Sequence, residues 1–226
     1  MARLARAIAV GVPLHVTQRG NRRQTTFFVA ADYARYRDLL AEWCRTCEVA
    51  VWAWCLMPNH VHLLLVPADE AGLRRALAET HRRYTQAVNR REGWVGHLWQ
   101  GRFASCLLDP PHVLAAARYI ELNPVRARLA AAPEAWPWSS APAHLGDRED
   151  GLTTLEPLRA EVGDWRAFLA AGLKEREADD LRRHARTGRP IGDAGFVAEM
   201  EKVLGRRLRP AKRGPKTAER TGQKVD

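Results

Sequence analysis

The chain has 226 residues, of which 46% are hydrophobic and 27% are charged. These proportions are those of a globular protein and exclude wholesale disorder. Lysine and arginine total 36 against 26 acidic residues, a formal net charge of +10, so the expected partner is an anion such as nucleic acid or a membrane surface.

A membrane-spanning role does not fit the apolar pattern. The longest uncharged run, residues 49–68, is long enough to span a bilayer, but Pro58, Asn59, His60 and His62 lie at its centre. Chain breaks and polar groups are most costly there, so we expect no transmembrane segment. The N-terminal apolar stretch is short and contains glycine and proline, unlike a signal peptide. The expected location is the cytoplasm.

Apolar periodicity predicts alternating strands and helices over the first part of the chain. The expected strands are 13–19, 49–56, 60–66 and 103–108. The expected helices are 32–47 with Asp32 as N-cap, 73–91, and one from residue 110 that ends at Asn123-Pro124. A tight break at 57–59 makes the second and third strands a hairpin. The predicted class is α+β, a ferredoxin-like or RRM-like antiparallel sheet with helices on one face.

The composition changes after the tryptophan-rich segment 136–140. We therefore expect a catalytic domain at 1–140, a polar linker at 141–154 and a helical C-terminal extension at 155–204. Residues 205–226 hold eight basic residues against two acids and few apolar ones. Such a composition predicts a basic, disordered tail.

Two histidines are predicted to share one side of the strand at 60–66. Because strand side chains alternate between faces, His60 and His62 project to one side and Val61 to the other. Two such imidazoles can bind one divalent ion, with a third ligand expected from another element. The alternative is an ordinary pair on a solvated face. The apolar run 63–66 argues against it, because imidazoles on a partly buried strand need a partner.

The helix that begins at residue 110 offers further candidates. Tyr119 and Asn123 are four residues apart and therefore share a helix face. A phenol can act as a nucleophile, and a carboxamide oxygen can bind a metal. A buried core tyrosine is the alternative. Tyr84 on the preceding helix has Val88 four residues on, with no ligand, so Tyr119 is the better candidate.

Four motifs occur in order along the chain: Met-Pro-Asn-His-Val-His-Leu at 57–63, Leu-Trp-Gln-Gly-Arg-Phe at 98–103, Tyr-Ile-Glu-Leu-Asn-Pro-Val-Arg-Ala at 119–127 and Trp-Pro-Trp-Ser-Ser at 136–140. Together they resemble the REP-associated tyrosine transposases, relatives of the single-tyrosine HUH transposases of small insertion sequences. The resemblance covers residues 12–140. The His-hydrophobic-His pattern alone is weak, but four ordered motifs are specific.

The resemblance implies a defined chemistry. His60 and His62 match the HUH metal ligands, Asn123 the third ligand and Tyr119 the nucleophile. The ion is expected to be Mg²⁺ or Mn²⁺, and attack by the tyrosine on a DNA phosphate would leave a 5′-phosphotyrosine and a free 3′ hydroxyl. The implied substrate is single-stranded DNA with hairpins, the repetitive extragenic palindromes. A monomer is expected rather than a homodimer.

Basic and aromatic residues are the expected DNA contacts. Residues 1–29 hold five arginines and no acid, and the helix at 73–91 adds a basic face. Such charge supplies affinity rather than choice of sequence. Trp99 and Phe103 are expected to stack on unpaired bases, with core packing as an equal alternative. The expected DNA-binding residues are Arg19, Arg22, Arg23, Arg82, Arg83, Trp99, Gln100, Arg102, Phe103 and Arg126.

Two other functions would use these residues differently. A domesticated, non-catalytic protein that binds DNA or RNA hairpins would keep the arginines but leave His60, His62 and Tyr119 without a joint purpose. A zinc hydrolase would need an acidic general base near the histidines. The nearest acids, Asp69 and Glu70, lie beyond the end of the strand, so a metal-dependent DNA transposase is the preferred prediction.

Overall fold

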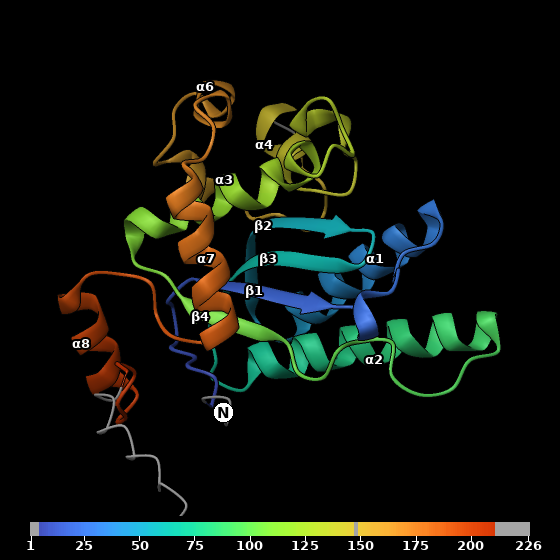
Figure 1. The fold of residues 1–226 in the computed structure, drawn as a ribbon, viewed down its shortest axis with the longest axis horizontal. Helices are drawn as coiled ribbons and strands as arrows, with labels where there is room; N and C mark the ends of the chain where they lie inside the picture. The colour runs from blue at the N-terminus through green and yellow to red at the C-terminus, as the bar shows by residue number, and fades with distance from the viewer. Residues whose placement is uncertain (1–4, 147–148, 211–226) are drawn as a thin grey trace, which may run out of the picture.

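The structure, a computed structural model, describes residues 5–146 and 149–210. At its centre lies an antiparallel sheet in the order β2-β3-β1-β4 (Figure 1). The strands are β1 (Leu14–Arg19), β2 (Val49–Met57), β3 (His60–Pro67) and β4 (Ala104–Leu107). With one helix after β1 and another after β3, this is the βαββαβ unit of ferredoxin-like folds. The predicted α+β class is confirmed.

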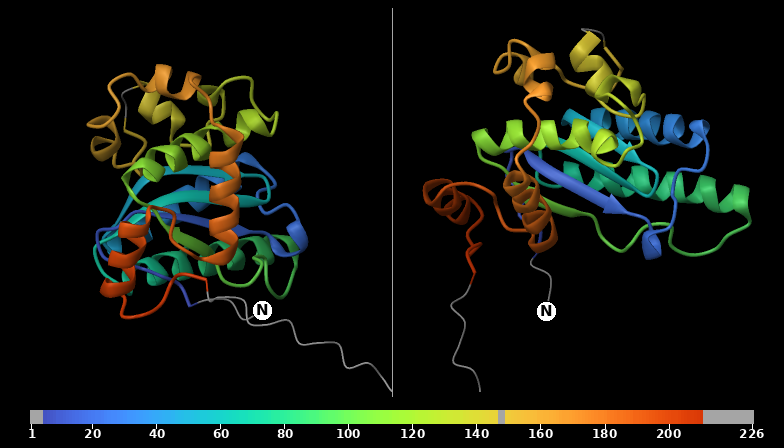
Figure 2. Two further views of the ribbon diagram at one scale, coloured as in Figure 1. Left: turned by 60° about the vertical axis from the view of Figure 1, so that its left-hand side comes forward. Right: turned by 45° about the horizontal axis from the view of Figure 1, so that its top comes forward.

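Helices α1 (Ala30–Thr46) and α2 (Gly72–Glu92) pack together on one face of the sheet (Figure 2). Apolar residues at spacings of three and four give each helix one buried stripe. Helix α1 begins two residues before the predicted N-cap, Asp32. The Asp32 carboxylate accepts hydrogen bonds from the backbone N–H groups of Phe28 and Val29, so it serves the helix start from inside the first turn.

The structure adds a second helical layer to the single layer that the sequence predicts. Helix α3 (Pro110–Arg126) packs on β2 and β3, and α7 (Glu175–Thr187) packs on β4 and β1 (Figure 1). The reason lies in β3, which is apolar on both faces. Leu63 belongs to the core under α1 and α2, whereas Leu64 belongs to the core under α3. A strand with two apolar faces requires cover on both.

Helix α3 continues past Pro124, where the sequence predicts its end. The proline lacks an N–H donor, but the helix resumes beyond it. Ala127 donates its N–H to the Asn123 carbonyl oxygen at 2.9 Å, and Leu129 donates to the Pro124 carbonyl oxygen at 2.8 Å. Tyr119 and Asn123 therefore lie on one continuous helix.

Short helices make up the described chain after residue 140. They are α4 (Ala141–Gly146), α5 (Glu156–Arg159), α6 (Trp165–Ala170), α7 and α8 (Ala194–Val203). Earlier in the chain, short 3-10 turns occur at Asn21–Arg23 and Pro133–Ala135. The predicted linker 141–154 thus contains α4, and the division into domains stays a prediction. The predicted tail lies outside the described residues from 211 on. No helix in the described ranges is long and apolar enough to cross a membrane.

A buried carboxylate joins α3 to α4 and α6. Glu121 is fully buried and accepts hydrogen bonds from Ser140 Oγ at 2.5 Å, from His144 Nδ1 at 2.6 Å and from Trp165 Nε1 at 2.7 Å. The His144 and Trp165 rings stack with their centroids 4.1 Å apart. Three donors satisfy a carboxylate whose burial would otherwise be costly, so Glu121 anchors the second layer.

Candidate active site

Neighbouring strands β1 and β3 carry polar side chains on the face covered by α3 and α7. In the antiparallel register Thr17 lies opposite His62, and Arg19 lies opposite His60. Alternate residues of a strand share a face. His15, Thr17 and Arg19 therefore project to the same side as the histidine pair.

Three histidines are in contact on this face. The His60 and His62 ring centroids are 4.9 Å apart, and the His15 ring stacks on His62 at 5.3 Å. His62 Nδ1 lies 3.0 Å from His15 Nε2, and His60 Nδ1 lies 2.6 Å from Asn59 Oδ1. Burial lowers the pKa of His15 and of His60 to about 4, and lowers the pKa of His62 well below its usual range. All three are neutral at neutral pH, the form that binds metals.

Helix α3 places Tyr119 against these histidines. The phenol ring meets His62 edge-on at a centroid distance of 5.4 Å and His15 at 5.9 Å. The Arg126 guanidinium lies over the phenol ring, 5.3 Å from its centroid. Arg182 of α7 also reaches this tyrosine: burial opposes its charge, but side-chain hydrogen bonds, among them one with Tyr119, raise the pKa of Arg182.

The three histidines and Tyr119 line a cavity of about 680 Å³, here called the tyrosine cavity. Its other lining residues include Arg19, Arg23, Arg102, Arg182 and Arg186, and no acidic side chain is among the described residues that line it. Burial, and after it the positive charge of the neighbouring Arg23, lowers the pKa of Arg19. An arginine-rich hollow of this kind suits a phosphate group.

The donor set at the histidine pair fits a divalent ion with open positions. Among the described residues, no group of three or more His, Cys, Asp or Glu could hold a metal. Further ligands would therefore be an amide, water or phosphate oxygen. Both His60 and His62 have Nδ1 engaged, which leaves Nε2 as the ligand atom. Asn123 lies one turn beyond Tyr119 but does not line the tyrosine cavity; its Nδ2 is buried and has no partner in the described structure.

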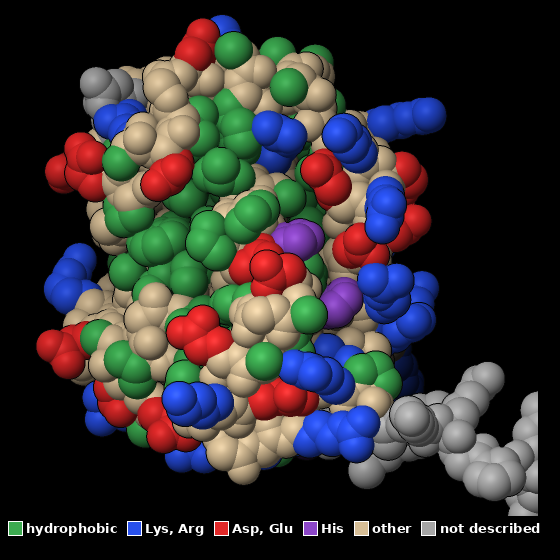
Figure 3. All heavy atoms as spheres, turned by 90° about the vertical axis from the view of Figure 1, so that its left-hand side faces the viewer, with side chains coloured by type: hydrophobic (Ala, Val, Ile, Leu, Met, Phe, Trp, Pro, Cys, Tyr) green, Lys and Arg blue, Asp and Glu red, His purple; other side chains and the backbone are tan. Residues whose placement is uncertain are grey.

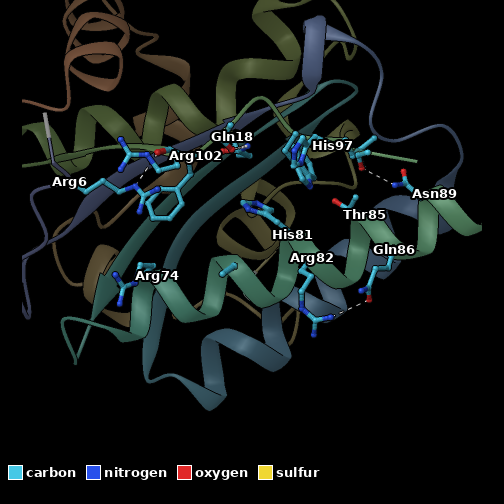
Figure 4. Close-up of a pocket in the computed structure, with 16 residues that line it drawn as sticks. Arg6, Gln18, Arg74, His81, Arg82, Thr85, Gln86, Asn89, His97 and Arg102 are labelled. Atoms are coloured by element: carbon cyan, nitrogen blue, oxygen red, sulfur yellow. Dashed lines mark hydrogen bonds between the residues drawn. The ribbon is translucent and has the colours of Figure 1, made fainter. Parts of the chain in front are cut away.

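A second cavity of about 670 Å³ runs along α2 beside the segment 96–103 and is here called the α2 groove (Figure 4). Arg6, Arg74, Arg82 and Arg102 line it, again with no acid among the lining residues that the structure describes. Arg102 lines the tyrosine cavity as well, and so does Gln18. The two basic hollows are therefore adjacent.

The predicted DNA-binding residues divide between these places. Those lining the tyrosine cavity are Arg19, Arg23, Gln100 and Arg102. Those lining the α2 groove are Arg82, Trp99, Arg102 and Phe103. The remaining three line neither cavity and are Arg22, Arg83 and Arg126. Trp99 and Phe103 are also buried members of the core, so their ring faces are largely used in packing.

Several residues at the site were not predicted from sequence. His15 and Thr17 were not predicted, but they alternate with the predicted Arg19 along one strand, and this alternation could have indicated them. Arg182 and Arg186 come from a helix far along the chain, and nothing local in their sequence indicates this placement. Conversely, Tyr84 is fully buried and donates its hydroxyl to the Thr26 carbonyl oxygen at 2.6 Å, as a core tyrosine does.

Comparison with known proteins assigns the chain to a family. The model of the family described as "Transposase IS200 like" matches residues 10–123, half of the chain, and this range includes His60, His62, Tyr119 and Asn123. The chain therefore belongs to the IS200-like transposase family. Among curated proteins, no sequence matches it.

Two solved structures are similar to this one. A REP-associated tyrosine transposase bound to a REP hairpin superposes with a TM-score of 0.56 at 21% sequence identity, over 65% of this chain and 86% of that one. A candidate transposase from Deinococcus radiodurans R1 gives a TM-score of 0.37 at 19% identity, over 57% of this chain and 92% of that one. The first match confirms the fold expected from the resemblance to REP-associated tyrosine transposases.

Proposed function

We propose that this protein is a single-strand DNA transposase that cleaves and rejoins hairpin-bearing DNA through a covalent link to Tyr119. One observation carries the proposal: Tyr119 contacts the neutral His62, beside His60, inside an arginine-lined cavity. Membership of a transposase family supports a DNA substrate. A zinc hydrolase is not favoured, because no acid that could serve as general base is among the described lining residues.

In the proposed reaction the Tyr119 hydroxyl oxygen attacks the phosphorus of the scissile phosphodiester. A tyrosine O–P bond forms and the P–O3′ bond breaks, while the phenol proton is released to solvent and the leaving 3′ oxygen gains a proton. The 5′-phosphotyrosine keeps the energy of the broken bond, so later attack by a 3′ hydroxyl can rejoin DNA without ATP. Arg182, which lines the same cavity and interacts with the phenol, would orient it.

His60 and His62, with Asn123 as the proposed third ligand, would hold Mg²⁺ or Mn²⁺. When bound, the ion would supply Lewis-acid polarisation of a non-bridging phosphate oxygen. Arg19 and Arg102 line the same cavity and would bind the remaining phosphate charge.

The α2 groove is the proposed binding site for the DNA segment next to the scissile phosphate. It shares Gln18 and Arg102 with the tyrosine cavity, so one DNA strand can contact both. The hairpin form of the substrate is proposed from the relative that was solved with a REP hairpin. The basic lining would give affinity through phosphates, whereas the choice of sequence would require base contacts.

The decisive experiment incubates the full-length protein with end-labelled, single-stranded hairpin DNA from its own genome, in Mn²⁺ or in EDTA. We expect a metal-dependent adduct that resists SDS and carries the 3′-side fragment. Tyr119→Phe removes the nucleophile and should abolish the adduct. Tyr84→Phe is the matched control, because it removes a phenol hydroxyl that serves only the core.

Two outcomes would contradict the proposal. An adduct that persists in Tyr119→Phe would place the covalent link elsewhere. Hairpin binding without any adduct, across several hairpins and both metals, would instead support the non-catalytic hairpin-binding protein.

A further inference from the structure

The turn between β2 and β3 determines which atom of Asn59 faces His60. Asn59 Nδ2 donates a hydrogen bond to the Arg23 carbonyl oxygen at 3.0 Å. A carbonyl oxygen only accepts, so the amide group must be on that side and Oδ1 must face His60. Oδ1 also only accepts, so the 2.6 Å contact requires the ring hydrogen to sit on His60 Nδ1. The lone pair of His60 is then on Nε2.

The segment that presents the Arg23 carbonyl is itself held in place. Gly20 donates its N–H to the Asn59 carbonyl oxygen at 2.8 Å, and Arg23 donates to the Gly20 carbonyl oxygen at 3.0 Å. A Cβ at Gly20 would lie 2.4 Å from the Gln24 carbonyl oxygen, closer than real Cβ atoms approach. The glycine therefore permits a tight turn that anchors Asn59 from both its backbone and its side chain.

His15 takes the corresponding position beside His62. It projects from β1 with 1% of its surface exposed, and its ring plane lies 9° from that of His62. His15 Nε2 and His62 Nδ1 are 3.0 Å apart, so one of them must donate. When His62 binds a cation through Nε2, its hydrogen sits on Nδ1 and His15 is the acceptor.

We propose that Asn59 and His15 are positioning residues that hold His60 and His62 with both Nε2 atoms toward one divalent cation. The inference rests on the proposed function of the histidine pair and adds two residues that act through the ligands. A hydrogen bond to the second ring nitrogen fixes the tautomer and orientation of a histidine ligand, and its loss typically weakens metal binding roughly 10–100-fold.

Calorimetric titration of the full-length protein with Mn²⁺, without DNA, tests this separately from catalysis. We expect Asn59→Leu and His15→Phe each to weaken Mn²⁺ binding roughly 10–100-fold. His15→Gln should lose less, because its side-chain oxygen can still accept from His62. His112→Phe is the control: it removes an imidazole that bonds to Asp109 outside the tyrosine cavity, and it should leave Mn²⁺ binding unchanged.

A second measurement requires no substitution and so does not depend on whether a variant folds. Nitrogen-15 NMR of the metal-free protein should show His60 in the tautomer that carries its hydrogen on Nδ1. A hydrogen on Nε2 would overturn the inference, because Asn59 would then not orient this ring.

Thermal unfolding of each variant separates lost metal binding from lost folding.

The outcomes also separate this inference from the proposed function. If wild-type protein binds Mn²⁺ and His60→Ala abolishes binding, while Asn59→Leu and His15→Phe bind as wild type, the positioning role fails and the proposed metal site stands. If wild-type protein does not bind Mn²⁺ without DNA, the positioning inference fails, whereas the adduct experiment still decides the proposed function. Weakened binding in both variants with unchanged melting temperatures supports the inference.

Discussion

Neutral histidines, buried or partly buried, occur on both sides of the sheet, and their surroundings explain their charge state. The His81 ring on α2 packs at a tilt against Trp99 with ring centroids 4.9 Å apart, and its Nε2 pairs with the Tyr36 hydroxyl at 2.9 Å. Burial lowers the pKa of His81 to about 3. His81 lines the α2 groove, and no carboxylate is among the described residues of that lining, so protonation would place an unpaired charge at a partly buried position.

This burial predicts a stability loss in mild acid. In the unfolded chain His81 takes up a proton near the ordinary histidine pKa of 6.5. In the folded protein its pKa is about 3, so the side chain stays neutral until the pH falls to that value. Protons therefore favour the unfolded chain as the pH falls below 6.5. Between pH 7 and pH 5 this histidine should remove about 2 kcal/mol of folding free energy. Urea unfolding of wild type and His81→Gln at both pH values should show a smaller loss in the variant; equal losses would refute the assignment.

At the scale of elements, α3 both carries the nucleophile candidate and anchors the second layer. One face of α3 places Tyr119 against the histidines. On a different face of the same helix, Glu121 accepts hydrogen bonds from His144 of α4 and Trp165 of α6. The position of Tyr119 thus depends on contacts with residues that follow the matched family range of 10–123. Stability of the C-terminal helices and geometry of the site are linked through this helix.

Replacing Glu121 tests that link. Glu121→Leu leaves the donors of Ser140, His144 and Trp165 buried without an acceptor, and should lower the free energy of unfolding by about 3–5 kcal/mol. Glu134→Gln is the control, since Glu134 pairs with Arg166 at an exposed site, and its loss should be about 1 kcal/mol or less. Denaturant unfolding measures both, and a similar small loss in the two variants would contradict the anchoring role.

Element types were largely predictable, and the exceptions have physical causes. The predicted strands 49–56 and 60–66 agree with β2 and β3 to within one residue, because their apolar runs and the Pro58-Asn59 break are local signals. The helix end at Pro124 was wrong, because packing of α3 on the sheet outweighs the lost hydrogen bond of one proline.

At the scale of the whole molecule, positive charge dominates the two adjacent hollows. The formal net charge is +10, yet many surface arginines are paired with acids on α2 and α7. On the face drawn in Figure 3, basic side chains gather along one side with acidic ones among them. Arginines without acidic neighbours in the lining, such as Arg102, are therefore the ones placed to bind phosphate.

Salt dependence of DNA binding tests this distribution. Each phosphate contact with single-stranded DNA contributes about 0.7 to the slope of log affinity against log salt. Arg102→Ala should lower that slope by about 0.7–1 in fluorescence anisotropy with labelled hairpin DNA. Arg45→Ala removes an exposed arginine of α1 that lines neither hollow and should leave the slope unchanged. Equal slopes in all three proteins would contradict a phosphate contact at Arg102.

Sequence periodicity was enough to predict most element types, the sharing of one strand face by His60 and His62, and the sharing of one helix face by Tyr119 and Asn123. These follow from the periods of strands and helices, which are local properties. Three contacts could be found only from the three-dimensional structure: His15 with His62, Asn59 with His60 Nδ1, and Arg182 with Tyr119. Strand register and helix packing set those contacts, and both depend on which distant surfaces bury each other rather than on the order of neighbouring residues.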